Sequence, residues 1–149
     1  MGIGKQALFF TMLLIALVEA AMSTTDSKDK VDKFVISPTK TIVRIYNKLG
    51  EGLNLTIHCK SKDDDLGVST VAYNSYFYWK FRVNFLGTTL FFCGLSWRDA
   101  SGVFDMYKAK RDMKRCPTRC NWEAQKDLVQ GLRQGDNVHD MAFNWTYKT

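Results

Sequence analysis

The chain has 149 residues, 46% of them hydrophobic, with 21 Lys and Arg against 15 Asp and Glu and a formal net charge of +6. This length fits one domain, and it is long enough to build one hydrophobic core. After the first segment no long apolar run occurs, which excludes a protein with several membrane-spanning helices.

The N-terminal pattern is typical of a secretory signal peptide. A positively charged start, Met1–Lys5, precedes the apolar run Ala7–Val18, and small residues follow at Ala20 and Ala21. A membrane-spanning helix needs about 20 apolar residues, so this run favours a signal peptide over an anchor. We therefore expect residues 1–20 to be removed on export, with no membrane insertion afterwards. Localisation would then be extracellular.

Residues 23–33 are polar and charged without periodicity, and we expect residues 21–40 to form a flexible segment. Residues 41–48 are rich in β-branched side chains and predict a strand. Residues 53–60 alternate more cleanly and predict a half-buried strand. Its inward face would hold Leu53, Leu55, Ile57 and Cys59, and its outward face Asn54, Thr56, His58 and Lys60.

Three further segments alternate in the same way, residues 75–85, 87–97 and 103–110. Two short strand candidates follow near the C-terminus, and only residues 123–132 show a weak helical period. The aromatic side chains fall at alternate positions, which favours core packing over a ligand platform. They are Trp79, Phe81, Phe91, Trp97, Phe104 and Trp122. Residues 41–149 therefore predict one all-β domain, an antiparallel sandwich or barrel.

Four cysteines, Cys59, Cys93, Cys116 and Cys120, remain after the predicted signal peptide. An even number in an oxidising compartment favours two disulfides. Zinc is the alternative, but structural zinc sites favour tight pairs such as C-x₂-C. Here only the last two cysteines are close in sequence. The three possible pairings stay open.

The other polar clusters do not predict catalysis or metal binding. Asp63, Asp64 and Asp65 lack the alternating oxygens of a calcium loop, and a polar loop is the simpler interpretation. His58 adjoins a cysteine expected to be oxidised, and the only other histidine is His139. A Cys–His pair needs a free thiolate. We therefore expect no enzyme, no cofactor and no metal site.

Two sequons, Asn54-Leu55-Thr56 and Asn144-Trp145-Thr146, are candidate glycosylation sites in an exported chain. Asn54 is the better candidate because strand alternation turns it outward. The charge excess gathers in "KAKRDMKRCPTR", Lys108 to Arg119. In an exported protein this favours a wall, an acidic receptor loop or a lipid surface over a nucleic acid.

The sequence resembles the plant self-incompatibility S-protein homologues over nearly all of the mature chain. The resemblance lies in "VRIYNKLGEGLNLTIHCKSKDDDLG", "YFYWKFRVNFLGTTLFFCGLSW", "FDMYKAKRD" and "CPTRCNW". It implies a small, secreted, disulfide-linked β-sandwich of immunoglobulin-like type. The shared cysteines of the family correspond to Cys59, Cys93, Cys116 and Cys120. The founding role of the family is a ligand from female tissue that pollen recognises, after which growth of self pollen stops.

From this resemblance we expect a recognition protein that binds a plant cell-surface receptor protein. Binding would use exposed loops on a rigid scaffold. The candidate loops are Ser61 to Asn74, Arg98 to Gly102 and Lys110 to Arg119, and the last offers Lys114, Arg115 and Arg119 as partner-binding residues. The alternative hypothesis is a secreted basic defence protein that binds microbial membranes or walls.

Overall fold

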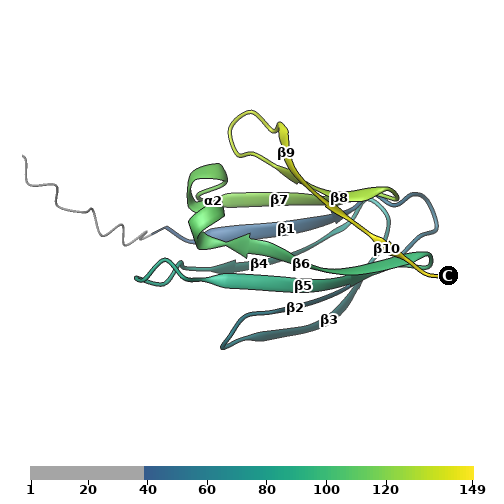
Figure 1. Ribbon diagram of the computed structural model, residues 1–149, viewed down its shortest axis with the longest axis horizontal. Helices are drawn as coiled ribbons and strands as arrows, with labels where there is room; N and C mark the ends of the chain where they lie inside the picture. The colour runs from purple at the N-terminus through teal and green to yellow at the C-terminus, as the bar shows by residue number, and fades with distance from the viewer. Residues whose placement is uncertain (1–38) are drawn as a thin grey trace, which may run out of the picture. The chain divides into compact units, whose positions relative to one another are not determined.

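The computed structural model describes residues 39–149, whose strands form two five-stranded sheets packed against each other (Figure 1). The predicted signal peptide and almost all of the expected flexible segment lie outside the described residues. The described part contains ten strands and one short helix, α2 (Ala109–Arg115). Within it, no helix has the length and apolar character needed to cross a bilayer.

The first sheet, sheet A, has the strand order β4-β1-β7-β8-β9. These strands are β1 (Thr41–Asn47), β4 (Tyr76–Phe81), β7 (Arg119–Ala124), β8 (Leu128–Leu132) and β9 (His139–Asn144). β1 pairs antiparallel with β4 but parallel with β7, so the sandwich is not wholly antiparallel. The weak helical period of residues 123–132 does not correspond to a helix, because β8 is a strand paired on both sides.

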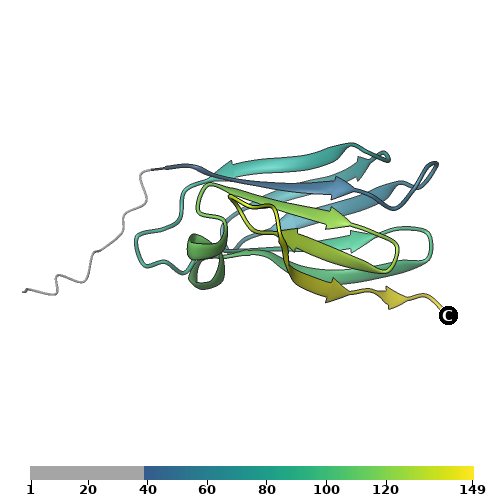
Figure 2. The same ribbon diagram turned by 90° about the horizontal axis from the view of Figure 1, so that it is seen from above.

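The second sheet, sheet B, has the order β10-β6-β5-β2-β3, and all of its pairs are antiparallel. Its strands are β2 (Leu55–Lys60), β3 (Asp65–Val71), β5 (Leu90–Ser96), β6 (Ala100–Lys108) and β10 (Thr146–Tyr147). The chain leaves sheet A after β9 and joins sheet B as β10 (Figures 1 and 2). The prediction of a disulfide-linked β-sandwich is confirmed.

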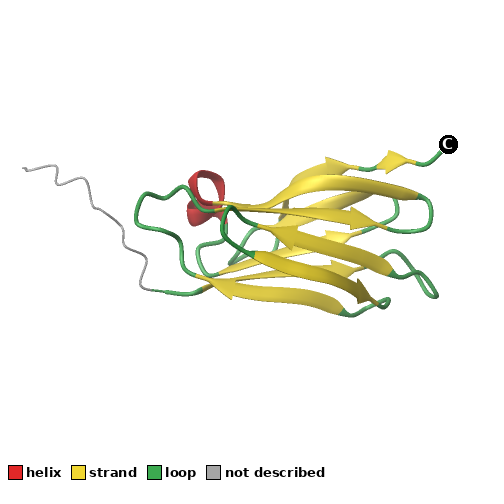
Figure 3. Cartoon of the chain, turned by 90° about the horizontal axis from the view of Figure 1, so that it is seen from below, coloured by secondary structure: helices red, strands yellow, loops and turns green. Residues whose placement is uncertain are grey.

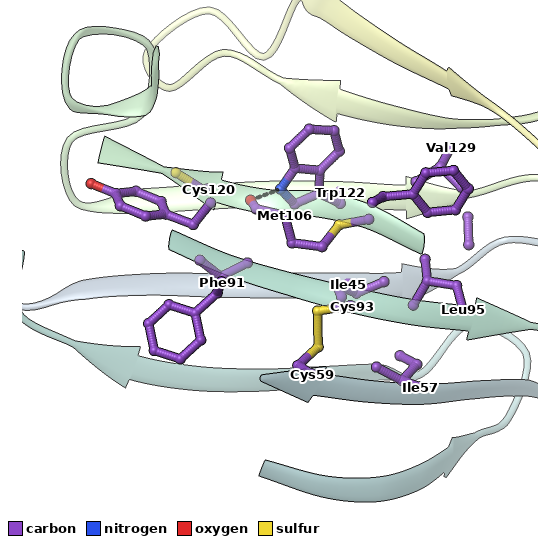
Figure 4. Packing of buried hydrophobic residues seen from close by; sticks show 14 of the residues in the cluster. Ile45, Ile57, Cys59, Phe91, Cys93, Leu95, Met106, Cys120, Trp122 and Val129 are labelled. Atoms are coloured by element: carbon purple, nitrogen blue, oxygen red, sulfur yellow. Dashed lines mark hydrogen bonds between the residues drawn. A yellow bond between two sulfur atoms is a disulfide. The ribbon is translucent and has the colours of Figure 1, made fainter. Parts of the chain in front are cut away.

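The inward faces predicted by alternation form the core between the sheets (Figure 4). The predicted face of β2 is buried at Leu55, Ile57 and Cys59. Five of the six aromatic side chains predicted to pack in the core are buried, and Phe81 is partly buried against them. Core packing is therefore the correct interpretation of that aromatic cluster.

Alternation fails in β6, where Met106 and Tyr107 are neighbours and are both fully buried. The pairing with β5 shifts at this point, since Phe92 faces Asp105 and Phe91 faces Tyr107. Such a bulge places two residues opposite one and redirects the side chains that follow. Tyr107 therefore points into the core, although strict alternation would place it on the face of the exposed Val103.

Two of the expected loops are partly strand. The segment from Ser61 to Asn74 contains β3, and β6 begins at Ala100 inside the segment from Arg98 to Gly102. β3 escaped prediction because it is an edge strand with most side chains exposed on both faces, which leaves no apolar alternation. Asp65 therefore begins a strand and does not lie in an exit loop.

The disulfides are Cys59–Cys93 and Cys116–Cys120, which decides among the three pairings left open by the sequence. Cys59 and Cys93 face each other in register on β2 and β5 of sheet B. Cys116 and Cys120 join the end of α2 to β7. Neither bond connects sheet A to sheet B, so the two sheets are held together by other contacts.

One such contact is the fully buried side chain of Asn47, at the end of β1. Its Nδ2 donates to the carbonyls of Leu53 at 2.7 Å and Val71 at 2.8 Å, and its Oδ1 accepts from the backbone N–H of Leu49 at 3.0 Å. Val71 ends β3 in sheet B, so this amide ties the two sheets together where the chain crosses between them.

We predict that Asn47→Ala lowers the free energy of unfolding by about 3 kcal/mol or more. The substitution leaves buried backbone groups of Leu49, Leu53 and Val71 without their partner, and each such group costs about 1–3 kcal/mol. Chemical denaturation of the purified protein measures the change. Asn54→Ala, at an exposed position, is the control. Equal stability of the two variants would contradict the role given to Asn47.

Candidate functional site

The basic segment, defined as residues 108–120, carries six cationic side chains and one carboxylate. It contains α2, which lies at one end of the sandwich (Figure 3). The sequence predicted a loop here, and a short helix followed by a tight connection forms instead. Lys108, Lys110, Lys114 and Arg119 are exposed, whereas Arg111 is half-buried and Arg115 is buried.

The carboxylate of Asp112 organises this segment from inside. It is fully buried and accepts a hydrogen bond from the backbone N–H of Lys108 at 2.8 Å. Arg111 donates to it at 2.7 Å and Arg115 at 3.3 Å. Arg115 also donates to Asp140 of β9 at 2.7 Å. A buried charge is tolerated when it is paired and hydrogen-bonded, so two of the six cations serve to fix the helix.

The same two arginines lie over the ring of Trp122, which projects from β7. Their guanidinium carbons are 5.5 Å (Arg111) and 5.0 Å (Arg115) from the ring centroid, within the range of cation–π contact. The indole N–H of Trp122 donates to the carbonyl of Met106 at 2.8 Å. The ring also stacks on Phe143 with centroids 5.3 Å apart. The helix is thus fastened to both β7 and β9.

Gly131 of β8 provides the space for this arrangement. A Cβ atom at this position would lie 2.2 Å from Arg115 Nη2 and 2.8 Å from an edge carbon of the Trp122 ring. Because the ring is held by its hydrogen bond and its stacking, a side chain at Gly131 has little room to displace it.

The connection after the helix is held at several points. The side-chain oxygen of Gln134 accepts from the backbone N–H groups of Thr118 at 3.0 Å and Arg119 at 2.9 Å. The hydroxyl of Thr41 donates to the carbonyl of Pro117 at 3.0 Å. Together with the Cys116–Cys120 bond, these contacts present the exposed cations from a pre-organised backbone, which reduces the entropy lost on binding.

Of the three residues predicted to bind a partner, Lys114 and Arg119 are exposed and lie in this segment. Arg115 is not an exposed loop residue, because its guanidinium is occupied by Asp112 and Asp140 and covered by its neighbours. Sequence reasoning did not identify the structural role of Asp112. The signal was its place as the single acid in a basic run, three residues before Arg115 and so on the same helical face.

Tyr107 lies on the inner side of the same region. Burial raises the pKa of its hydroxyl to about 12, with the nearby Thr41 hydroxyl opposing this effect and the charge of Asp112 adding to it. The neutral hydroxyl is therefore the form that the folded protein favours.

The three consecutive aspartates, Asp63 to Asp65, lie where the chain turns from β2 into β3, the edge strand of sheet B. Asp65 accepts a hydrogen bond from the backbone N–H of Gly67 at 2.9 Å, and it contacts His58 at 2.6 Å and Lys60 at 3.0 Å. These contacts, led by the Gly67 N–H, hold the pKa of Asp65 well below its usual range. Within residues 39–149, no cluster of three or more His, Cys, Asp and Glu side chains is arranged to hold a metal.

The two sequons occupy different settings. Asn54 is exposed just before β2, as strand alternation predicts. Asn144 is exposed at the end of β9, and the next residue, Trp145, is buried where the chain crosses to β10. The indole of Trp145 donates to the carbonyl of Gln125 at 2.7 Å. The tryptophan of the second sequon therefore belongs to the core.

We predict that Gly131→Ala lowers the free energy of unfolding by about 1–3 kcal/mol, the usual cost of overpacking a filled core. Gly94→Ala is the matched control, since it is also a strand glycine and its added Cβ would meet only the His58 carbonyl at 3.9 Å. Urea denaturation of both variants measures the difference. A loss for Gly131→Ala no larger than that for Gly94→Ala would contradict the close packing of Trp122 and Arg115.

We predict that Tyr107 makes the free energy of unfolding fall at alkaline pH. The pKa of Tyr107, about 12 in the folded protein, lies above the value of about 10 expected in the unfolded chain. The resulting stabilisation is complete below pH 10 and is lost as the pH rises toward 12. Between pH 9 and pH 11 the parent protein should therefore lose about 1 kcal/mol more than Tyr107→Phe. Tyr147→Phe, at an exposed site, is the control, and identical pH profiles for all three proteins would refute the assignment.

Comparison with known proteins identifies the family. The profile of the plant self-incompatibility protein S1 family matches residues 42–145. S-protein homolog 3 of Arabidopsis thaliana is 35% identical over 141 residues, covering 91% of this chain and 92% of the relative. S-protein homolog 28 of the same plant is 47% identical over 108 residues, covering 72% and 69%.

A solved structure shows the same fold. It is described as that of SPH (Self-Incompatibility Protein Homologue) proteins, a widespread family of small, highly stable, secreted proteins from plants. The two chains align with a TM-score of 0.58 and 18% identity, over 72% of this chain and 95% of the other. With the profile match and the two curated relatives, the chain belongs to the plant self-incompatibility protein S1 family.

Proposed function

We propose that the chain is a secreted plant recognition protein whose basic segment binds an acidic surface of a cell-surface receptor protein. The observation that carries the proposal is the separation of cations within residues 108–120. Arg111 and Arg115 are used inside the fold, whereas Lys108, Lys110, Lys114 and Arg119 face solvent on a backbone tied at both ends. Exposed charge on a rigid support favours specific association with an acidic partner.

The relatives support the secreted and plant parts of this proposal. They are named S-protein homologs, and the solved structure is described as belonging to small secreted plant proteins. The disulfides agree with an oxidising compartment. In this view the N-terminal segment directs export, and Asn54 carries a sugar. Rejection of self pollen, the role implied by the family resemblance, is one form of such cell–cell recognition.

The proposal gives the chain no catalytic role. The two histidines lie on different sheets, where His58 contacts Asp65 and His139 lies 3.4 Å from Glu123. All four cysteines are in disulfides. The groups that a nucleophilic mechanism would use are therefore engaged elsewhere or separated.

One observation favours the alternative, a basic defence protein that binds microbial membranes. The turn between β4 and β5 exposes Leu86, with 64% of its surface accessible, next to Phe85 at 65%. A shallow hollow lined by Gly87, Lys108 and Lys110 connects this turn to the basic segment. An apolar tip beside cations fits insertion into an anionic lipid surface.

The test uses charge reversal with a matched control. Lys114→Glu/Arg119→Glu should weaken binding to plant plasma-membrane vesicles by roughly tenfold or more, because complementary charge is replaced by repulsion. Lys62→Glu/Lys126→Glu changes the net charge equally outside the basic segment and should bind like the parent protein. Vesicle co-sedimentation measures binding, with and without prior protease treatment of the vesicles.

Three outcomes distinguish the hypotheses. Binding that is lost after protease treatment and in the Lys114/Arg119 variant supports a protein receptor. Equal losses in the two double variants would contradict the assigned segment. Binding to protein-free anionic vesicles that falls in Leu86→Ser would replace the receptor proposal with the membrane alternative.

A further inference from the structure

The outer face of β1 and β4 carries an arrangement that the basic segment does not explain. We call it the tyrosine platform and define it by the outward residues of the two strands. In register across the strands, Ile42 faces Lys80, Arg44 faces Tyr78, and Tyr46 faces Tyr76. Sequence alternation puts the three residues of each strand on one face, but it does not show that the two strands are neighbours.

The rings and cations of the platform form one continuous surface. The ring centroids of Tyr46 and Tyr76 are 5.1 Å apart, and those of Tyr76 and Tyr78 are 6.1 Å apart. Arg44 lies 5.8 Å from the centroid of Tyr76, and Lys80 lies 5.9 Å from that of Tyr78. A shallow hollow of about 200 Å³ is lined by Ile42, Arg44, Tyr76, Tyr78 and Lys80.

The fold makes little use of these side chains. The opposite face of β4 packs into the core through Trp79, while Tyr76 and Tyr78 keep 47% and 52% of their surface exposed. Within residues 39–149, neither Arg44 nor Lys80 forms an ion pair with a carboxylate. The outward residues of the two strands include no acid. Two cations without a carboxylate partner and the two exposed rings of Tyr76 and Tyr78 are thus available to a ligand.

The chemistry of this face matches a chain of acidic sugars. Tyrosine offers an apolar ring face, on which the flat side of a sugar ring can pack, and a hydroxyl that hydrogen-bonds. Arg44 and Lys80 can pair with carboxylates carried by such sugars, and arginine does so in a bidentate way. Because β-strands hold the side chains, the surface needs little reordering on binding.

A nucleic acid fits the face less well. Single-stranded nucleic acids are bound in a positively charged groove that follows the backbone phosphates. Here an acid interrupts the positive charge, since Glu123 of β7 is in register next to Tyr46. A second hollow of about 230 Å³ is lined by Tyr46, Lys48, Asn121, Glu123 and Leu132, and so includes this acid.

We propose that the tyrosine platform binds a polysaccharide whose sugars carry carboxylates. The inference goes beyond the receptor proposal and does not depend on it, because the platform and the exposed lysines of the basic segment are different residues.

The experiment measures binding of the intact protein to a short oligogalacturonate by isothermal titration calorimetry. Tyr76→Ala/Tyr78→Ala should weaken binding at least tenfold. The control Tyr73→Ala/Tyr147→Ala removes two tyrosines that are also exposed, at 40% and 55%, but lie outside the platform, and it should bind like the parent protein. Arg44→Gln/Lys80→Gln should lose binding, whereas Lys62→Gln/Lys126→Gln should not.

Each contrary result overturns the proposal. Equal losses of binding in Arg44→Gln/Lys80→Gln and in Lys62→Gln/Lys126→Gln would indicate that the ligand is attracted to any positive charge. Equal binding of a neutral galactan would remove the role of the carboxylates, and tighter binding of poly(U) at the same tyrosines would assign the face to nucleic acid. No measurable binding to the oligogalacturonate also refutes it. Thermal unfolding of every variant verifies that a loss of binding is not a loss of fold.

Discussion

The rest of the structure depends on the way β1 is fixed at both of its ends. At the end of β1, the buried side-chain amide of Asn47 donates hydrogen bonds to the carbonyls of Leu53 and Val71. The backbone carbonyl of Asn47 accepts a hydrogen bond from the backbone N–H of Asn74 at 2.9 Å. At its start, Thr41 bonds to Pro117, and the N–H of Ile42 donates to Thr118 at 2.9 Å. Since no disulfide joins the sheets, these polar contacts and the apolar core define how β1 sits in the sandwich.

β1 contributes to both proposed binding surfaces, the tyrosine platform and the basic segment. Its outward face supplies Arg44 and Tyr46 to the tyrosine platform, and its first residues support the connection after α2. A buried amide with three satisfied hydrogen bonds is stabilising only in one geometry. The placement of Asn47 therefore fixes the end of β1 against Leu53 and Val71, and the pairing of β1 with β4 and β7 sets the relative positions of the exposed rings and cations.

Much of the fold could be predicted because its strands alternate regularly. In β2 and β5 every second side chain enters the core, so the inward faces could be read directly from the sequence. β3 could not, since an exposed edge strand has no apolar face. The inward direction of the Tyr107 side chain could not be predicted either, because it results from the bulge in β6, and that bulge depends on the pairing with β5. Local patterns do not contain such long-range pairings.

The candidate site was predictable in composition but not in arrangement. The basic run marked the segment that carries the exposed cations, yet charge alone did not distinguish Lys114, which faces solvent, from Arg115, which is paired inside. That distinction depends on Asp140 of β9 and on the space left by Gly131 of β8. Both residues lie far along the chain, and only the folded sheet brings them to the helix. Likewise, three outward tyrosines become a platform only when β4 pairs with β1.

The two proposed surfaces adjoin each other. Arg119, at the end of the basic segment, is in register with Ile42, which itself faces Lys80 on the platform. A ligand chain lying along the platform would therefore end close to the cations offered to a receptor. Two weak contacts on one rigid body act together, since the first raises the effective concentration for the second. In an extracellular matrix of acidic sugars, retention near a cell surface and recognition by a receptor would then be properties of two adjoining surfaces, organised around β1.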